Sequence, residues 1–507
     1  MRGDDSVTAP GDRRRFLTLL GAVGVAGLAG CGGDGGETTT TTETGGDTAT
    51  PTPSRPGTET VPPGTETVPR RTETAPAPGT RTQAHTPTPT DSEDVSGFDG
   101  AIAEETLESY LSRAVTHAGL LAADEPGTGQ NLDEHLRMLG DIGAKFVGRA
   151  AYRWWGAGHG GYSGTHWEHV DERASRVHEE LGGEVILQAC LFETVHEHVG
   201  ERAVPDWVFE AFDRQPEDRT FDYEAMLYDS GLHVDRWADG LSVPDMSETE
   251  TRMWFYDRGR RYIDAGIEAL HLGQVHLMDG NDPDHEHWFD LVGKLREYAA
   301  ENARRGIVLA DAHTFGVTRG DELLFDFHSF PCRVQELLDD AELDRHDERF
   351  DGDVRSDDVL PGGLDEEGGI FGRSAGGTTP SGWSTESLPY LVEVDNFGIS
   401  DAPGEPTDGH FVWGYDEICW FARQPEWYRD GWLAYAHDWV AENTASGQFQ
   451  MPTNRTIYPA PVDVTYEDET YTANRYRANA PSSAMPTGFG QEETIAEVWS
   501  EALGPRA

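Results

Sequence analysis

The chain has 507 residues, and its 92 acidic side chains against 39 basic ones give a formal net charge of −53. Only two of the bases, Lys145 and Lys294, are lysines, so 39 − 2 = 37 are arginines. A nucleic acid backbone requires a basic stripe, so this charge balance argues against nucleic acid as a partner.

The N-terminus reads as a targeting segment. Arg13-Arg14-Arg15-Phe16-Leu17, followed by the apolar run 18–30, resembles a twin-arginine export signal. Leu28-Ala29-Gly30-Cys31 closes that run and resembles a lipoprotein lipobox. The resemblance implies that Cys31 is lipidated and that the chain is anchored at the extracellular face of the cell membrane. An uncleaved anchor helix with an incidental cysteine is the alternative.

Residues 32–96 are dominated by Thr, Pro, Gly and Glu. Such a segment has too few apolar side chains to offset the entropy of ordering, so we expect a disordered tether. From about Phe98 the composition becomes mixed apolar, aromatic and charged. We therefore divide the chain into a signal (1–31), a tether (32–96) and one catalytic-type domain (97–507).

The excess of acids with almost no lysine resembles proteins of halophilic archaea, because high salt screens self-repulsion. An acidic surface for a basic partner is the alternative. Of the four cysteines, Cys31 is assigned to the anchor. The three that remain provide no complete disulfide framework and no zinc-type spacing.

Eight strands separated mostly by helices are predicted along the remaining chain. The expected strands are Lys145–Ala150, Glu184–Glu193, Ala269–Met278, Gly306–His313, Leu323–His328, Pro389–Asn396, Phe411–Tyr415 and Gln448–Met451. The expected helices are Leu132–Gly143, His166–Leu181, Glu248–Ala265, Phe289–Arg305 and Asp416–Thr444, the last broken around Pro425.

This alternation predicts an α/β fold, a (β/α)8 TIM barrel with long loops at the C-terminal face of the strands. The connection between the fourth and fifth predicted strands lacks a helix. An open doubly wound sheet is the alternative. No Gly-rich dinucleotide or P-loop signature follows any strand, which disfavours that alternative and leads us to predict no cofactor.

Carboxylates end two of the predicted strands. Alternation places Glu193 on the barrel-facing side with Leu187, Ala189 and Leu191. It places Glu393 and Asp395 on the same side as Leu391. Two carboxylates that reach one pocket from different strands are the arrangement used for glycoside hydrolysis. We nominate Glu193 and Glu393 as catalytic, with Asp395 and Asp279 in reserve. Salt-bridged or solvated strand ends are the structural alternative.

Imidazoles end three further strands. Gln274 and His276 share one face, as do Asp311 with His313 and Asp326 with His328. These six side chains, together with Asp279, Asp395 and Asn396, are candidates for substrate binding. A metal site of His and carboxylate ligands, or a satisfied polar network, would give the same pattern.

Aromatic and cationic side chains complete the predicted pocket. Flat apolar faces rimmed by hydrogen-bonding groups suit sugar rings. Arg149, Arg153, Trp154 and Trp155 follow the first predicted strand, and Trp383 and Trp413 lie in or beside predicted mouth loops. We nominate these six residues as substrate-binding.

An exported barrel with carboxylates and tryptophans at its strand ends resembles a glycoside hydrolase of the large retaining TIM-barrel clan, over about Lys145 to Arg455. The resemblance is architectural. It implies a carbohydrate substrate. That clan places an Asn-Glu pair after its fourth strand and its nucleophilic Glu after the seventh. Here Asp311-Ala312-His313 follows the fourth predicted strand, and Glu393 follows the sixth.

Three functions are consistent with these patterns. The first is a lipid-anchored cell-surface glycoside hydrolase that acts through two carboxylates. The second is a metal-dependent hydrolase that uses His276, His313 and His328. The third is a surface lipoprotein that binds saccharide without catalysis.

Overall fold

The computed structural model of the protein describes residues 98, 100–123, 130–154, 164–337, 343, 359–364, 374–396, 415–457 and 461–502. All of them belong to a single unit of the chain. Cys31, Trp155 and Trp413 lie outside the described residues, as do the predicted signal and tether. The division of the chain at residues 31 and 96 therefore stays a prediction.

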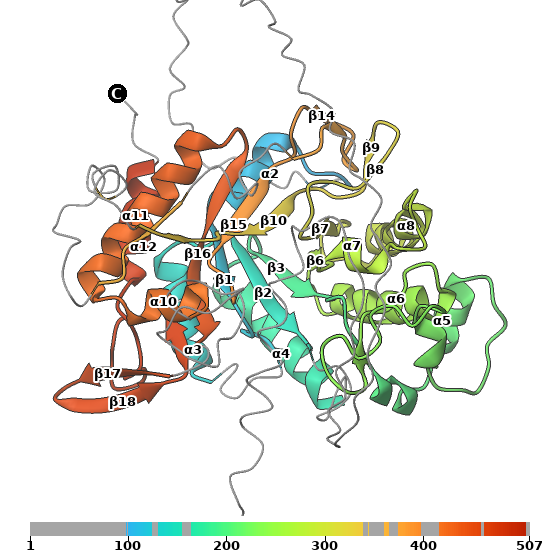
Figure 1. The fold of residues 1–507 in the computed structure, drawn as a ribbon, viewed down its shortest axis with the longest axis horizontal. Helices are drawn as coiled ribbons and strands as arrows, with labels where there is room; N and C mark the ends of the chain where they lie inside the picture. Colours follow the sequence, from blue (N-terminus) through green and yellow to red (C-terminus); the bar gives the residue numbers. More distant parts are fainter. Residues whose placement is uncertain are drawn as a thin grey trace, which may run out of the picture. The chain divides into compact units, whose positions relative to one another are not determined.

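Eight parallel strands form a nearly closed barrel, which confirms the predicted (β/α)8 fold (Figure 1). Neighbouring strands follow the order β10-β15-β16-β1-β2-β3-β6-β7. Their bounds are β1 Ala114–His117, β2 Phe146–Tyr152, β3 Ile186–Cys190, β6 Ala269–His271, β7 Leu309–Asp311, β10 His328–Pro331, β15 Tyr390–Glu393 and β16 Gly447–Thr456.

Two backbone hydrogen bonds close the seam between β7 and β10, one just ahead of β10 and one within it. The backbone N–H of Asp326 donates to Ala310 O at 2.9 Å, and that of Ser329 donates to Ala312 O at 3.2 Å. The Asp326 carboxylate accepts from Ala310 N at 2.9 Å and pairs with Arg296 at 2.8 Å. A side chain thus provides one of the ladder bonds at this seam.

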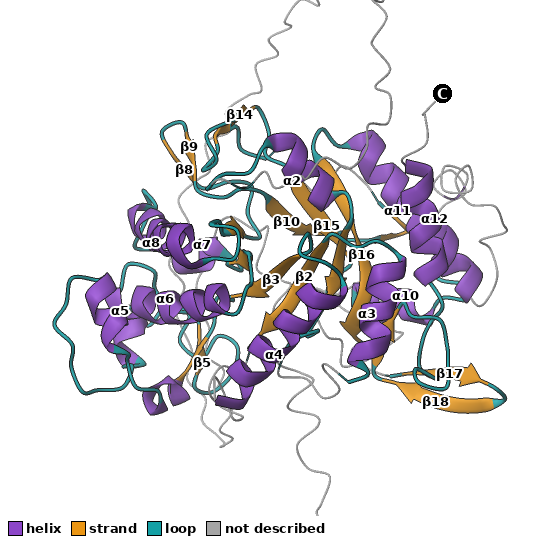
Figure 2. Ribbon diagram, turned by 180° about the vertical axis from the view of Figure 1, so that it is seen from behind, coloured by secondary structure: helices purple, strands orange, loops and turns teal. Residues whose placement is uncertain are grey.

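Helices connect most of the barrel strands and lie outside the sheet (Figure 2). The predicted helices correspond closely to α3 Leu132–Asp141, α4 Gly164–Glu180, α6 Thr249–Asp264, α8 Glu286–Asn302, α10 Glu417–Arg423 and α11 Glu426–Asn443. The other α-helices in the described part of the chain are α2 Glu104–Leu111, α5 Asp206–Ala211, α7 Val275–Met278 and α12 Glu492–Ala502. No helix among the described residues is long and apolar enough to cross a membrane.

Small sheets fill the longer connections. Between β7 and β10 a hairpin replaces the helix, as the sequence indicated, and it joins a second hairpin in a four-stranded sheet: β8 Thr318–Arg319, β9 Glu322–Leu323, β13 Gly377–Thr378 and β14 Ser384–Thr385. Among the described residues the remaining strands are β4 Val195–His196 with β5 Leu241–Ser242, β11 Gln335–Glu336 with β12 Gly362–Gly363, β17 Val462–Tyr466 with β18 Glu469–Ala473, and β19 Arg475–Arg477 along β16.

An apolar layer fills the barrel at the amino ends of the strands. It takes one side chain from each of seven strand segments and is covered by α2 through Leu107 and Leu111. The seven are Ala114, Phe146, Ile186, Ala269, Leu309, Phe327 and Leu391. Burial of this layer is the hydrophobic contribution that holds the barrel interior together.

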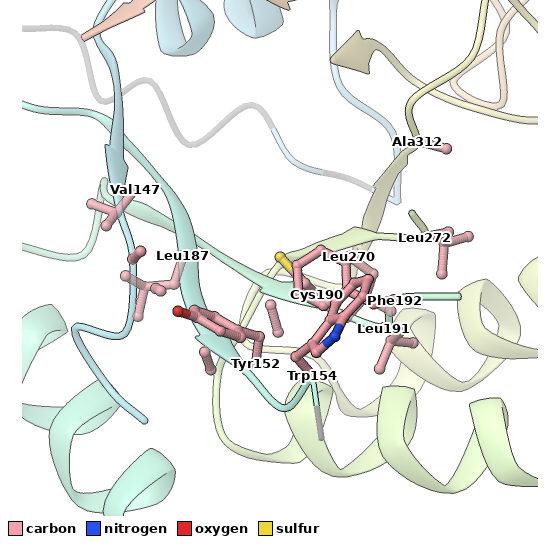
Figure 3. Close-up of a cluster of buried hydrophobic side chains, with 14 of the residues drawn as sticks. Val147, Tyr152, Trp154, Leu187, Cys190, Leu191, Phe192, Leu270, Leu272 and Ala312 are labelled. Atoms are coloured by element: carbon pink, nitrogen blue, oxygen red, sulfur yellow. The ribbon is translucent and has the colours of Figure 1, made fainter. Parts of the chain in front are cut away.

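A second apolar layer lies outside the strands, against the helices. Leu187 and Leu270 belong to it, together with Trp154 and Phe192, which follow β2 and β3 (Figure 3). The Trp154 and Phe192 rings meet edge to face with centroids 5.2 Å apart. Trp154 is therefore part of the packed core rather than an open sugar platform.

Three strand predictions need correction. The first barrel strand, β1, was missed, because four buried residues between two turns give too short an apolar run. The predicted strand Leu323–His328 was placed too early in the sequence, because β10 begins only at His328. The run at Ala269–Met278 ends as a strand at His271 and continues as α7. Of the predicted strand Phe411–Tyr415, residues 411–414 lie outside the described residues, so this strand stays a prediction.

Candidate active site

The barrel interior becomes polar two residues beyond the apolar layer, toward the carboxyl ends of the strands. The same strands that bury Ala114, Leu309 and Leu391 present Thr116, Asp311 and Glu393 one inward position later. Hydrogen bonds and ion pairs connect one side chain or backbone group from every barrel strand. We call this set the polar layer: Thr116, Arg149, Gln188, His271, Asp311, Ser329, Glu393 and Arg455. It lies at the mouth, the end where the carboxyl ends of the strands meet.

Glu393, at the end of β15, is one centre of the polar layer. Its side chain is 2 % exposed and accepts from Arg149 Nε at 3.0 Å, Thr116 Oγ1 at 3.1 Å and Arg455 Nη1 at 3.4 Å. Burial alone would raise the pKa of this carboxyl group. Arg149, His313 and Arg455 outweigh burial and hold the pKa of Glu393 well below its usual range, so Glu393 is ionised.

Asp395 lies two residues further along and nearer to solvent. Its Oδ1 accepts from Arg455 Nη2 at 2.7 Å and lies 3.7 Å from Arg149 Nη2. Burial again opposes ionisation, but Arg149 and Arg455 lower the pKa of Asp395. Its side chain is 13 % exposed, and no hydrogen bond to its Oδ2 occurs among the described residues. Asp395 therefore offers an ionised oxygen that no described residue contacts through a hydrogen bond.

Asp311, at the end of β7, is the second centre. Its Oδ1 accepts from Gln188 Nε2 at 2.7 Å, and its Oδ2 accepts from Ser329 Oγ at 2.6 Å and pairs with His271 Nδ1 at 2.8 Å. Asp311 is fully buried. The Gln188 side chain links the two centres, since its Oε1 accepts from the backbone N–H of Arg149 at 3.0 Å.

Arg149 reaches Glu393 through a local distortion of β2. The register between β2 and β3 shifts between Val147 and Ala151, and Arg149 has a φ of +56°. A left-handed backbone costs a non-glycine residue on the order of 1 kcal/mol. The bulge turns the guanidinium inward, onto Glu393. Gly148 beside it leaves room for Gln450, whose Nε2 would lie 2.2 Å from an added Cβ.

His313 follows β7 and lies above the two centres. Its Nε2 is 3.4 Å from Glu393 Oε1 and 3.4 Å from Arg149 Nη2. Its ring meets His271 edge to face, with centroids 4.7 Å apart. Of the residues nominated from the sequence, Arg149, Asp311, His313, Glu393, Asp395 and Asn396 are brought together here; Asn396 Oδ1 accepts from Arg455 at 2.9 Å.

Glu193 does not join this network among the described residues. Strand β3 ends at Cys190, and its inward side chains are Ile186 and Gln188, so the predicted alternation through Leu187 and Leu191 is displaced by one residue. Both Glu193 oxygens accept from Gln274, from its N at 2.9 Å and from its Nε2 at 2.8 Å. Glu193 is buried, and its link to Gln274 joins the loops after β3 and β6.

His276 and Asp279 lie on or beside α7, not on a strand, so the alternation that paired His276 with Gln274 does not apply. His276 is exposed, and Asp279 lies 3.8 Å from His285. The inward imidazole of this segment is His271, five residues earlier. A glycine with a left-handed backbone, Gly273, ends the strand between them.

Asp326 and His328 also differ from prediction. Asp326 precedes β10 and closes the barrel seam. On β10 the inward side chain is Ser329, so His328 faces outward, with its ring centroid 5.9 Å from that of Phe325. Burial lowers the pKa of His328 to about 4. A neutral imidazole packed among phenylalanines does not contribute to the mouth.

Two nominated residues make contacts outside the polar layer. Trp383 Nε1 donates to Ile102 O at 3.1 Å, and its ring packs on the apolar layer at the amino ends of the strands. Arg153 Nε donates to His166 Nδ1 at 3.0 Å, which ties the end of β2 to α4. Both were assigned to the mouth because each follows a predicted strand or loop. Their side chains instead contact Ile102 and His166.

Five members of the polar layer were not predicted: Thr116, Gln188, His271, Ser329 and Arg455. All but Arg455 share one signal, an apolar residue followed two positions later by a polar one, as in Phe327 and Ser329. Such pairs are common in any chain, so this signal acquires meaning only once the strands are known.

The metal-dependent alternative required His276, His313 and His328 to converge, and they do not. Among the described residues no group of three His, Cys, Asp or Glu side chains is placed to hold a metal ion.

Once β1 is counted, Glu393 ends the seventh barrel strand rather than the sixth. That is the position at which the resembled clan carries its nucleophile. The fourth strand, β6, is followed by Leu272-Gly273-Gln274, which contains no Asn-Glu pair. The chain thus matches one of the two expected positions and departs from the other.

No family model and no curated protein matches this chain. Solved structures give partial similarities. The debranching enzyme of Nostoc punctiforme has a TM-score of 0.23 at 11 % identity, covering 39 % of this chain and 41 % of that one. TtGalA, an alpha-galactosidase of Thermus thermophilus, has 0.26 at 15 %, covering 44 % of each chain. The glycoside hydrolase domain of PelA from Pseudomonas aeruginosa has 0.30 at 12 %, covering 67 % of this chain and 94 % of that one.

This chain spans less than half the length of the first two proteins. At such TM-scores the superpositions identify neither a family nor an activity.

Proposed function

We propose that this protein is a glycoside hydrolase whose active site is the polar layer. One observation carries the proposal. Two carboxylates at and just beyond the end of one strand, Glu393 and Asp395, are kept ionised by the same two arginines, and one Asp395 oxygen accepts no hydrogen bond from the described residues. An ionised carboxylate beside the sugar ring is the group that an oxocarbenium-like transition state requires.

The two carboxylates have different roles in this proposal. Glu393 is saturated by Thr116 and the two arginines, so it fixes those cations in place. Asp395 is more exposed and is the group that attacks the anomeric carbon or activates water. This revises the sequence-based nomination of Glu193 and Glu393, because Glu193 has both oxygens occupied by Gln274.

The test is hydrolysis of a panel of polysaccharides and aryl glycosides by the purified protein at high salt. We expect D395N and E393Q each to lower kcat by at least about 100-fold while the circular dichroism spectrum is unchanged. D290N is the matched control, since Asp290 forms an exposed i,i+4 pair with Lys294. Wild-type rates in both D395N and E393Q would refute the assignment. Saccharide binding without any turnover would favour the non-catalytic alternative.

We also propose that the enzyme is anchored at the outer cell surface through Cys31. The support is the order of the two N-terminal motifs, which lie outside the described residues. The test is expression with a C31A substitution in a host that exports through the twin-arginine route. We expect the wild type in the detergent phase of a phase-separation assay and C31A in the medium. A wild-type protein that stays in the aqueous phase would refute the anchor.

A further inference from the structure

His313 has a partner for each of its protonation states. When Nε2 carries a proton, it can donate to Glu393 Oε1 at 3.4 Å. When Nε2 is bare, it can accept from Arg149 Nη2, also at 3.4 Å. A group that gives and takes a proton needs both partners, because a buried polar atom without one costs on the order of 1–3 kcal/mol. His313 can therefore change its charge without leaving its Nε2 unpaired.

A second imidazole, that of His271, packs against the His313 ring. Asp311 holds Nδ1 of His271 at 2.8 Å, which leaves Nε2 of His271 as the basic nitrogen. That Nε2 is buried and has no partner among the described residues. The His271 ring stands edge-on to His313 with centroids 4.7 Å apart. The Asp311–His271 pair thus fixes the plane of the His313 ring.

Other buried histidines differ from His313. His117 and His135 pack against each other beside Arg475 and Arg477, and His328 packs among phenylalanines. No ion pair with a carboxylate is found for these three in the described part of the chain. The His313 side chain is 19 % exposed and borders Asp395 and Glu393.

We propose that His313 is the proton-transfer residue of this active site, and that His271 and Asp311 are positioning residues for it. The inference rests on the proposed function. The imidazolium of His313 gives a proton to the glycosidic oxygen as its bond to the anomeric carbon breaks. The oxygen of a water molecule bonds to that carbon, and Asp395 takes the proton that this water loses. Return of the proton from Asp395 to His313 through solvent restores both groups.

The charged groups that face His313 fix the direction of its pH dependence. Burial and the neighbouring cation Arg149 lower the pKa of His313, while Glu393 opposes them, and the net result is a pKa below the ordinary value. His271 and Asp395 are the other titratable neighbours. The active imidazolium therefore prevails at acidic pH, and activity falls as pH rises through the pKa of His313.

Leaving-group dependence tests the proposal. For a sugar leaving group, which needs a proton, we expect H313Q to lower kcat at least about 100-fold. For a dinitrophenyl leaving group, which departs without one, we expect less than about a threefold change. H271N should shift the pH profile and show a smaller version of the same selectivity. H437Q, a substitution of a histidine on the outer helix α11, is the control.

Two outcomes would overturn the proposal. One is an equal loss for both leaving groups in H313Q, which would indicate a structural role. The other is the selective loss in E193Q rather than in H313Q, which would make Glu193 the acid.

A substrate-free measurement separates this proposal from the proposed function. Imidazole NMR should show His313 titrating below about pH 6.5, with E393Q moving its pKa lower still. A His313 that stays neutral down to about pH 3 would refute the proton-transfer role even if D395N were inactive. Conversely, if D395N and E393Q were fully active, the proposed function would fail whatever His313 does.

Discussion

The Thr116 hydroxyl donates to Glu393 Oε2 at 3.1 Å, although the two residues are 277 positions apart in the chain. Thr116 belongs to the first barrel strand and Glu393 to the seventh. The contact exists only when the barrel has closed through β16, which lies between β15 and β1. The charges of the site are therefore brought together by the completed barrel and by no local motif.

Removal of Arg149 should be costly. R149M leaves Glu393 buried with Arg455 as its remaining cation, and loss of one partner of a buried pair destabilises by about 3–5 kcal/mol. We expect that loss in urea unfolding at neutral pH. R319M removes the exposed Arg319–Glu322 pair and should cost no more than about 1 kcal/mol. Equal effects of the two variants would contradict the buried ion pair.

Glu417 should make stability fall as pH rises. Burial raises its pKa to about 7 from an ordinary 4.5, although it accepts from Asp395 N at 2.8 Å and Val334 N at 3.2 Å. A folded-state pKa above the unfolded one gives stability that is present below pH 4.5 and lost as pH rises through 7. The loss is about 3 kcal/mol.

The variant E417Q cannot ionise. It should be less stable than wild type at pH 5, because its amide nitrogen cannot accept a hydrogen bond. It should also lose little further stability between about pH 5 and pH 8. Parallel pH profiles of wild type and E417Q in urea unfolding would contradict the assignment.

Gly273 and Gly231 form a matched pair of glycines. Both have a left-handed backbone, with φ of +66° and +75°. A Cβ at Gly273 would lie 1.9 Å from Glu193 Oε2, whereas one at Gly231 would meet nothing within 4 Å. G231A should cost about 1 kcal/mol from backbone strain alone, and G273A should cost at least about 2 kcal/mol more. Equal thermal shifts would show that Glu193 moves freely aside.

The seam of the barrel should depend on Asp326. D326A removes the acceptor of the Ala310 amide and the partner of Arg296. We expect a loss of about 3 kcal/mol and faster hydrogen exchange at Ala310 than at Leu270 in the adjacent strand β6. D290A, on the exposed face of α8, should change neither. Unchanged exchange at Ala310 in D326A would mean that the seam is held by the backbone alone.

The net charge of −53 predicts a stability that rises with salt. Screening shortens the reach of self-repulsion from about 10 Å at 0.1 M to about 3 Å at 1 M. We expect the melting temperature to rise steadily from 0.1 M to 2 M potassium chloride, and sucrose of equal osmolality to raise it less. A melting temperature independent of salt would argue against adaptation to high salt.

The helices were predictable because their apolar stripes recur over ten or more residues. Short strands were harder. β1 has four residues, and β6 and β7 have three each, which is too few for alternation to fix a register. For this reason Glu193 and His328 were predicted to face the barrel interior, but neither joins the polar layer. A register shift of one residue exchanges the inward and outward faces, as it does for Gln188 and Ser329.

At β15 the prediction of inward faces succeeded, because Leu391, Glu393 and Asp395 alternate with Tyr390, Val392 and Val394 over six residues. The contacts themselves could not be predicted. Arg149 reaches Glu393 because its own backbone is left-handed, and the sequence Val147-Gly148-Arg149 does not predict a bulge. Likewise, no spacing relates Arg455 to Asp395, because Asp395 follows β15, Arg455 lies on β16, and the described part of the connection between these strands includes α10 and α11.

The chain enters the barrel through α2, which covers the apolar layer at the amino ends of the strands. Phe98 packs there, with the Arg305 guanidinium 4.1 Å above its ring. The point of attachment for everything that precedes residue 98 is thus at the closed end, opposite the polar layer. Under the proposed anchoring at Cys31, the tether would therefore join the barrel at the end opposite the proposed active site.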